Sequence, residues 1–143
     1  MIQNIIRTRN SGAILFIRIM IGSVFLSEGI QKFLFPALRG AGRFESIGLP
    51  FPDFLGPFVG VFEITCGILI LIGLVTRLAS IPLITIMVVA ITTTKIPILA
   101  SDGLWQMLHA ARTDWAMLLG GFFLLMKGGG KWSVDQFLMH RGS

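Results

Sequence analysis

The stretch of residues 54–74, FLGPFVGVFEITCGILILIGL, restricts the fold more than any other part of the sequence. It has 21 residues and is almost wholly apolar, with one carboxylate, Glu63, near its middle. A helix of about 20 residues rises about 30 Å, which is the hydrocarbon thickness of a bilayer. The stretch therefore predicts a transmembrane helix that carries an ionisable group at membrane depth.

Three glycines share one face of this helix with Glu63. Gly56, Gly60, Glu63 and Gly67 are spaced i, i+4, i+7 and i+11. Glycines at such spacing let another helix approach closely, so we predict a helix-packing role for them and expect Glu63 to point into a bundle. Two interpretations of Glu63 stay open. It is either a proton-exchanging functional group or a protonated structural residue that is hydrogen-bonded to a neighbouring helix.

Composition supports a membrane protein and argues against two other classes. The chain is 54% hydrophobic and 13% charged, with a mean hydropathy of +0.83. The net charge of +5 comes from scattered Lys and Arg residues without a basic run, so we expect no nucleic-acid partner. The single cysteine, Cys66, lies inside the apolar stretch, which makes thiol–disulfide chemistry by this chain alone unexpected.

Three further apolar runs predict an all-α membrane protein, a four-transmembrane-helix bundle formed by one domain, 1–143. The expected spans are 12–35, 54–74, 78–99 and 112–128. The Gly- and Pro-rich but apolar loop 36–53 and the semi-polar segment 100–111 are expected at the interface on the non-cytoplasmic side. We expect a break near Ala111, where the fourth helix begins.

The first span carries three charged residues. Arg18 lies early in it, and its long side chain is expected to snorkel to the near interface. Glu28 and Lys32 are spaced i, i+4 in the favourable orientation for an ion pair, which is the interpretation that we prefer. The alternative is a polar site formed by Glu28, Gln31 and Lys32.

Two charged residues lie near the ends of the later spans. Lys95 is expected to reach the far interface. Asp114 follows Arg112 and Thr113 at the start of the fourth helix, where an acidic residue complements the helix dipole. We favour a capping role for Asp114 over a role as proton carrier.

The charges of the loops favour both termini in the cytoplasm. The side of the termini would hold Arg7, Arg9, Arg77, Lys127, Lys131 and Arg141, and the other Arg39, Arg43 and Arg112, with Lys32 and Lys95 at helix ends. Glu28, Lys32, Arg112 and Asp114 then share the non-cytoplasmic end, with Glu63 about half a membrane thickness away. These five are the candidate substrate-binding residues, and Glu63 and Glu28 are the candidate catalytic groups.

Five short motifs in a fixed order resemble the DoxX family of small bacterial four-helix membrane proteins. The resemblance covers about residues 16–138, and none of its pieces is specific alone. The motifs are Glu28-Gly29-x-x-Lys32-Phe33, Gly48-Leu49-Pro50, Glu63-x-x-x-Gly67-x-Leu69-x-Leu71-x-Gly73-x-x-Thr76-Arg77, Arg112-Thr113-Asp114 and Gly128-x-Gly130-x-Trp132-Ser133-x-Asp135.

This resemblance implies a multi-pass protein of the bacterial cytoplasmic (inner) membrane that acts as a subunit of a quinone-linked oxidoreductase or as a membrane dock for a soluble redox or sulfur enzyme. Glu28, Lys32 and Glu63 are then the natural site residues, and Arg77 is a structural turn residue. We expect no metal site and no covalent cofactor, because a bis-histidine haem needs two His at membrane depth and only His109 and His140 exist. A quinone and a redox partner protein are the implied ligands.

Two alternatives use the same residues. The chain could be a small proton-coupled permease with the carboxylates as carriers. Four spans are few for a transporter, and a homo-oligomer would compensate for that. It could also be a non-catalytic assembly factor in which the polar groups only hold the bundle together. The residue pattern alone leaves open whether the chain is an enzyme component.

Overall fold

The computed structural model describes residues 2–141, and within them every regular element is a helix. The helices are α1 (Ile2–Ile6), α2 (Ile14–Leu34), α3 (Ala41–Ser46), α4 (Pro52–Ile72), α5 (Thr76–Thr94), α6 (Ile96–Asp102), α7 (Leu104–Ala110), α8 (Arg112–Lys127) and α9 (Val134–Arg141). The predicted all-α class is therefore confirmed.

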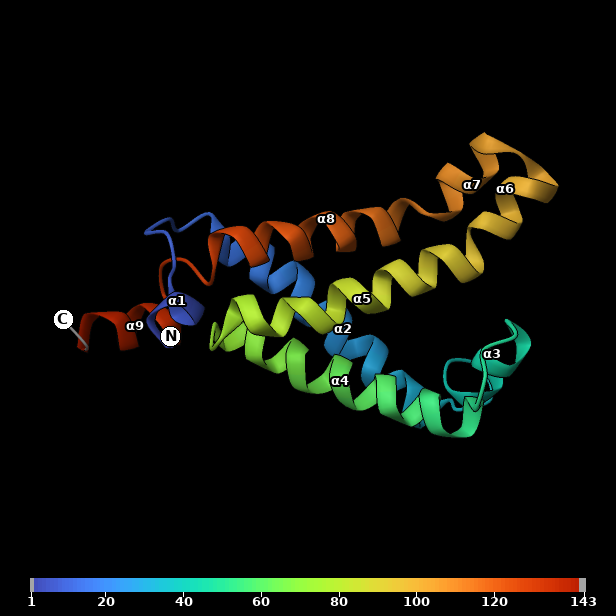
Figure 1. The fold of residues 1–143 in the computed structure, drawn as a ribbon, viewed down its shortest axis with the longest axis horizontal. Coiled ribbons are helices and arrows are strands. Elements are labelled where there is room, and N and C mark those ends of the chain that lie inside the picture. Colours follow the sequence, from blue (N-terminus) through green and yellow to red (C-terminus); the bar gives the residue numbers. More distant parts are fainter. Residues whose placement is uncertain (1, 142–143) are drawn as a thin grey trace.

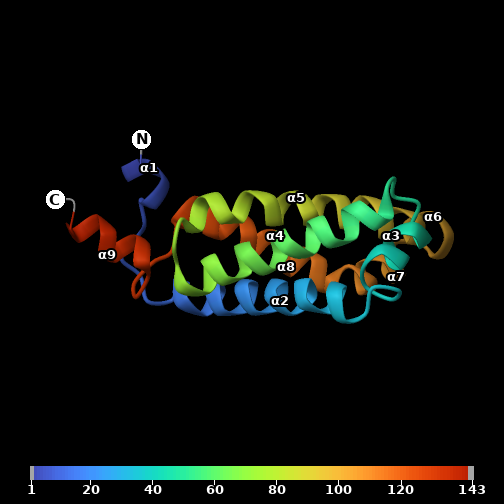
Figure 2. The same ribbon diagram turned by 90° about the horizontal axis from the view of Figure 1, so that it is seen from below.

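Four helices, α2, α4, α5 and α8, lie side by side and form the bundle (Figure 2). Helices α1 and α9 lie at one end, and α3, α6 and α7 lie at the other (Figure 1). Helix α2 packs mainly on α4, and α5 packs mainly on α8. The two pairs diverge towards the end that carries α3, α6 and α7 (Figure 1).

Among residues 2–141, three helical stretches are long and apolar enough to cross a bilayer. They are Ile14–Leu34, Pro52–Ile72 and the stretch Thr76–Asp102, in which α5 and α6 follow one another. Helix α8 has 16 residues, fewer than the about 20 that a helical span needs. Three candidate spans are thus established, and a fourth crossing by α8 remains a prediction, which its packing along α5 supports.

Glycines bring α2 and α4 into backbone contact. A Cβ atom added to Gly67 would lie 3.0 Å from the carbonyl oxygen of Gly22, and one added to Gly29 would lie 2.8 Å from that of Gly60. Gly56 lies against α3 instead, because a Cβ there would meet the backbone nitrogen of Ala41 at 2.7 Å. Close packing of this kind is the main attraction between helices in a bilayer, where lipid chains are as apolar as side chains.

Arg18 does not snorkel to the interface, contrary to our prediction. Its side chain is buried, and its guanidinium donates hydrogen bonds to four backbone carbonyls, two at the end of α4 and two in the segment before α9. The acceptors are Ile70, Leu71, Gly129 and Trp132. Carbonyls at a helix C-terminus have no partner within the helix, so a buried guanidinium satisfies them and is neutralised in part by their dipoles.

Asp135 fastens the C-terminal segment to the turn between α4 and α5. Its two carboxylate oxygens accept the backbone N–H groups of Val75, at 2.7 Å, and Thr76, at 3.0 Å. Val75 has φ of 44°, a left-handed conformation that a β-branched residue rarely adopts. The strained turn persists because Asp135 holds both N–H groups at the start of α5.

The chain departs from straight helices at two places near the opposite end. The run from Thr76 is interrupted at Lys95, and Pro97 lies at the start of the following helix α6, where a missing N–H is tolerated. Ala111 separates α7 from α8 with φ of −90° and ψ of 0°, at the position of the expected break. The loop between α2 and α4 contains the short helix α3.

Candidate functional site

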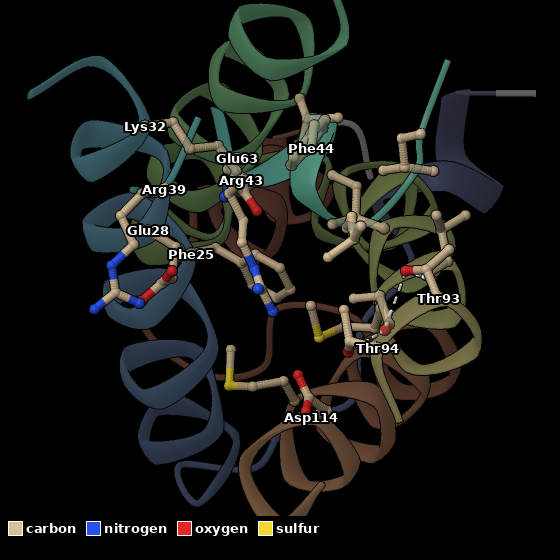
Figure 3. Close-up of a pocket in the computed structure, with 18 of the residues that line it drawn as sticks. Phe25, Glu28, Lys32, Arg39, Arg43, Phe44, Glu63, Thr93, Thr94 and Asp114 are labelled. Atoms are coloured by element: carbon tan, nitrogen blue, oxygen red, sulfur yellow. Dashed lines mark hydrogen bonds and ion pairs between the residues drawn. The ribbon is translucent and has the colours of Figure 1, made fainter. Parts of the chain in front are cut away.

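A cavity of about 720 Å³ lies between the two helix pairs, at the end where they diverge. Its walls come from α2, α4, α5 and α8, and the loop that contains α3 lines its outer end. Most of the lining is apolar, as with Phe25 and Met117. Charged side chains from α2, α4, α8 and the loop that contains α3 also line it (Figure 3). The charged lining residues are Glu28, Lys32, Arg39, Arg43, Glu63, Lys95 and Asp114.

The more buried of the two ion pairs in the cavity joins Lys32 and Glu63. The Nζ atom of Lys32, in the last turn of α2, lies 2.7 Å from Oε2 of Glu63 in the middle of α4. The side chains are only 9% and 3% exposed, so water screens the pair little. Glycine packing makes this contact possible, because Gly29 and Gly60 allow the two helices to approach closely on either side of it.

A second ion pair lies on the opposite side of the cavity and joins the end of α5 to α8. Nζ of Lys95, at the end of α5, lies 3.1 Å from Oδ2 of Asp114 in the first turn of α8. These side chains are 18% and 22% exposed, so this pair is more accessible than the first. Asp114 makes no side-chain cap at the N-terminus of α8, which corrects that expectation, although it lies in the first turn, where its charge complements the helix dipole. That Lys95 reaches the far interface remains a prediction.

The predicted pairing of Glu28 with Lys32 is also wrong, since Lys32 turns to Glu63 on the neighbouring helix. Glu28 lines the same cavity without an ion pair closer than 4 Å to any described residue. The desolvated carboxylate of Glu63 gains more from a cation than a half-exposed Glu28 does, because charge interactions strengthen where water is excluded. The i, i+4 rule describes an isolated helix and omits this competition.

Four of the five candidate binding residues thus meet in one cavity: Glu28, Lys32, Glu63 and Asp114. Arg112 does not, because it is exposed and its guanidinium donates to the carbonyl of His109. Sequence reasoning missed Arg39 and Arg43, which line the cavity from the loop between α2 and α4. Figure 3 shows the Arg43 side chain pointing from α3 into the cavity. The high apolar content of that loop was the available signal that it lies on the bundle.

Cations slightly outnumber carboxylates in this site. Four basic side chains face three acidic ones, and two of the acidic ones are already paired. Arg39 and Arg43 are exposed and lie at the outer end, whereas Lys32 and Glu63 lie deep. Within residues 2–141, no group of three His, Cys, Asp or Glu side chains comes close enough together to hold a metal ion. The arrangement suits a ligand with an apolar body and a polar head that accepts hydrogen bonds or exchanges protons.

Fold and site together define a small helical membrane protein with a charged cavity inside its bundle. A family model for DoxX matches residues 13–96, and the chain belongs to the DoxX family. The chain is 50% identical over 137 residues to the "Uncharacterized membrane protein Rv3486" of Mycobacterium tuberculosis, covering 92% of this chain and 84% of that protein. It is 28% identical over 125 residues to the "Putative oxidoreductase CatD" of Bacillus subtilis, covering 87% of this chain and 85% of that protein. No solved structure matches the chain.

Proposed function

We propose that this protein is the membrane subunit of a quinone-linked redox system, and that the cavity binds the quinone head group. The observation that carries the proposal is the Lys32–Glu63 ion pair, buried in a largely apolar cavity of about 720 Å³. We further propose that it lies in the bacterial cytoplasmic membrane with both termini in the cytoplasm, as the loop charges favour.

A buried ion pair of this kind contributes little to the free energy of folding. The cost of removing two charges from water is about as large as their attraction, and apolar side chains of similar volume are often as stabilising. Ionisable groups at membrane depth are therefore functional candidates by default. Lys32 and Glu63 face a cavity instead of a fully packed core, which supports a role towards a ligand.

The residues present fit a quinone. Ligand cavities commonly have volumes of about 300–1,000 Å³ with mostly apolar walls, and this cavity lies within that range. A quinone ring packs on apolar side chains such as Phe25, while its carbonyl oxygens need hydrogen-bond donors. The Lys32 ammonium is a buried donor, and the Glu63 carboxyl beside it is a group that exchanges protons.

Arg39 and Arg43 extend the polar lining from the ion pair to the outer end of the cavity, and Glu28 lines it one turn before Lys32 on α2. Protons that Lys32 or Glu63 release or accept would be exchanged with water along this side. Reduction of a quinone to a quinol takes two electrons and two protons, and the electrons would come from a cofactor of a partner enzyme. The two histidines of the chain lie in α7 and α9, at opposite ends of the bundle, so they are not placed for joint haem ligation (Figure 1).

Similarity gives modest further support. DoxX membership agrees with a membrane role, and one relative at 28% identity carries an oxidoreductase name. A permease would need a path past the buried Arg18 cluster at the far end of the bundle, which the observed packing disfavours. An assembly factor would need the charged groups only for contact between helices, and the open cavity beside them is not explained by that role.

The proposal is tested by purifying the full chain from its native membrane in a mild detergent. Co-purifying proteins are identified by mass spectrometry, and extracted quinone is quantified per protein. We expect a stoichiometric redox enzyme, an enriched quinone, or both, and we expect Glu63→Gln to lower the quinone content. Glu45→Gln is the control and should leave the quinone content unchanged, because Glu45 is an exposed carboxylate of α3 that does not line the cavity. A homo-oligomer with neither a redox enzyme nor a quinone would refute the proposal.

A further inference from the structure

We propose that a second cleft, at the end of the bundle that carries α1 and α9, binds the phosphate-bearing head group of an anionic phospholipid. This basic cleft has a volume of about 400 Å³ and is lined by Arg7, Thr8, Arg9, Arg77, Met126 and Lys127. It lies at the opposite end from the cavity that Lys32 and Glu63 line, so the inference does not rest on the proposed function.

Backbone hydrogen bonds hold the walls of the basic cleft in place. The Arg77 guanidinium donates to the carbonyls of Arg7 and Met126, each at 2.8 Å, and so joins the N-terminal segment to the end of α8. The backbone N–H of Arg9 donates to the carbonyl of Lys127 at 3.1 Å. The side chains of Arg9 and Lys127 are therefore not needed to build the cleft.

The positive charge of the basic cleft is not neutralised by the described part of the chain. The cleft has four basic lining residues and no acidic one. None of the four forms an ion pair within residues 2–141. Asp135, the acidic residue near this end, is committed to the backbone N–H groups of Val75 and Thr76. Lys and Arg groups of this kind bind phosphate by charge-assisted hydrogen bonds.

An apolar stripe leads from the basic cleft towards the middle of the bilayer, which favours a lipid over a free anion as the ligand. Met126 lines the cleft and is 67% exposed, and Phe122 and Leu119 are exposed four and seven residues before it on α8. Seven residues of helix span about 10 Å, so an acyl chain attached to a head group in the cleft would lie along these three side chains. Basic clefts between transmembrane helices are known sites for anionic head groups.

The test measures lipid binding by the purified full chain in detergent, using native mass spectrometry. The probes are phosphatidylglycerol and phosphatidylcholine with the same acyl chains, and soluble glycerol 3-phosphate as the tail-free anion. The cleft variant is Arg9→Gln with Lys127→Gln. The matched control is Lys131→Gln with Arg141→Gln, which removes two charges at the same end from exposed residues that do not line the cleft.

We expect one tightly bound phosphatidylglycerol in the natural chain, and roughly five-fold weaker binding for each cleft charge removed. The control variant and the conservative Lys127→Arg should bind as the natural chain does. Equal losses in the cleft and control variants would overturn the proposal in favour of diffuse surface charge. Binding of glycerol 3-phosphate as tight as that of the lipid would overturn the lipid assignment in favour of a free anion. A melting temperature within a few degrees of that of the natural chain ensures that a loss reflects the site.

Discussion

Removing one partner of the Lys32–Glu63 pair should destabilise the bundle far more than removing both. At 2.7 Å and an effective dielectric constant of about 20, the attraction between the charges is about 6 kcal/mol. Removing each ion from water costs several kcal/mol, so the intact pair is close to neutral for stability. Glu63→Leu or Lys32→Met alone leaves a buried charge without its partner, which costs about 3–5 kcal/mol.

The double variant Lys32→Met with Glu63→Leu removes both charges and keeps similar volume. We expect its free energy of unfolding to lie within about 1–2 kcal/mol of that of the natural chain, because no buried charge is left unpaired. The assay is equilibrium unfolding in mixed micelles, followed by tryptophan fluorescence, for the natural chain, the two single variants and the double variant. The resulting double-mutant cycle gives the coupling energy directly.

The Lys95–Asp114 pair is the control, because it also joins a lysine to a carboxylate, but at 18% and 22% exposure. Breaking it should cost at most about 1 kcal/mol, as for most exposed ion pairs. If the effects of Lys32→Met and Glu63→Leu simply add in the double variant, the two charges are not coupled and our description of the site is wrong.

Three further changes test other parts of the structure. Gly67→Val should lower the free energy of unfolding by about 1–3 kcal/mol or more in the same assay, because the valine side chain would meet the α2 backbone. The control Thr65→Val, on the exposed face of α4, should change it by less than about 0.5 kcal/mol. Asp135→Ala should lower the free energy of unfolding by about 1–3 kcal/mol, because the two N–H groups at the start of α5 lose their acceptor. The C-terminal segment should also be cut faster by protease, and cleavage no faster than in the natural chain would contradict this. Cys66 is buried, so a maleimide should label it only after unfolding, and rapid labelling of the folded protein would show that the α4 face is open.

Much of the fold follows from the sequence because membrane helices obey local rules. An apolar stretch of 21 residues predicts α4, and the spacing of Gly56, Gly60 and Gly67 predicts which of its faces is packed. Glu63 lies on that face and is buried, so the inference that it points into the bundle is confirmed.

The partners of the charged residues could not be predicted in the same way. Arg18 donates hydrogen bonds to carbonyls that lie 52 to 114 residues away in the chain. Lys32 pairs with a carboxylate on another helix and not with the one that lies four residues away. Both choices depend on which groups are desolvated after packing, which spacing along one helix does not encode. One signal for Arg18 was present, since it shares its helix face with Gly22 and that face is packed.

The cavity itself was beyond sequence reasoning, because it arises from the divergence of two helix pairs. Arg43 enters it from a loop whose position depends on α3, and α3 lies against Gly56 of α4. A single sequence contains no direct record of such contacts between elements.

We propose that Lys32 and Glu63 form the polar end of a quinone site. The most direct measurement is equilibrium binding of a short-chain quinone to the natural chain and to the Lys32→Met with Glu63→Leu variant, both in lipid nanodiscs. We expect saturable binding to the natural chain with one site, and a loss of at least about tenfold in affinity in the folded variant, since a lost hydrogen bond to a charged group is worth about 1.5–3 kcal/mol. Equal binding to both proteins, or none to either, would contradict it.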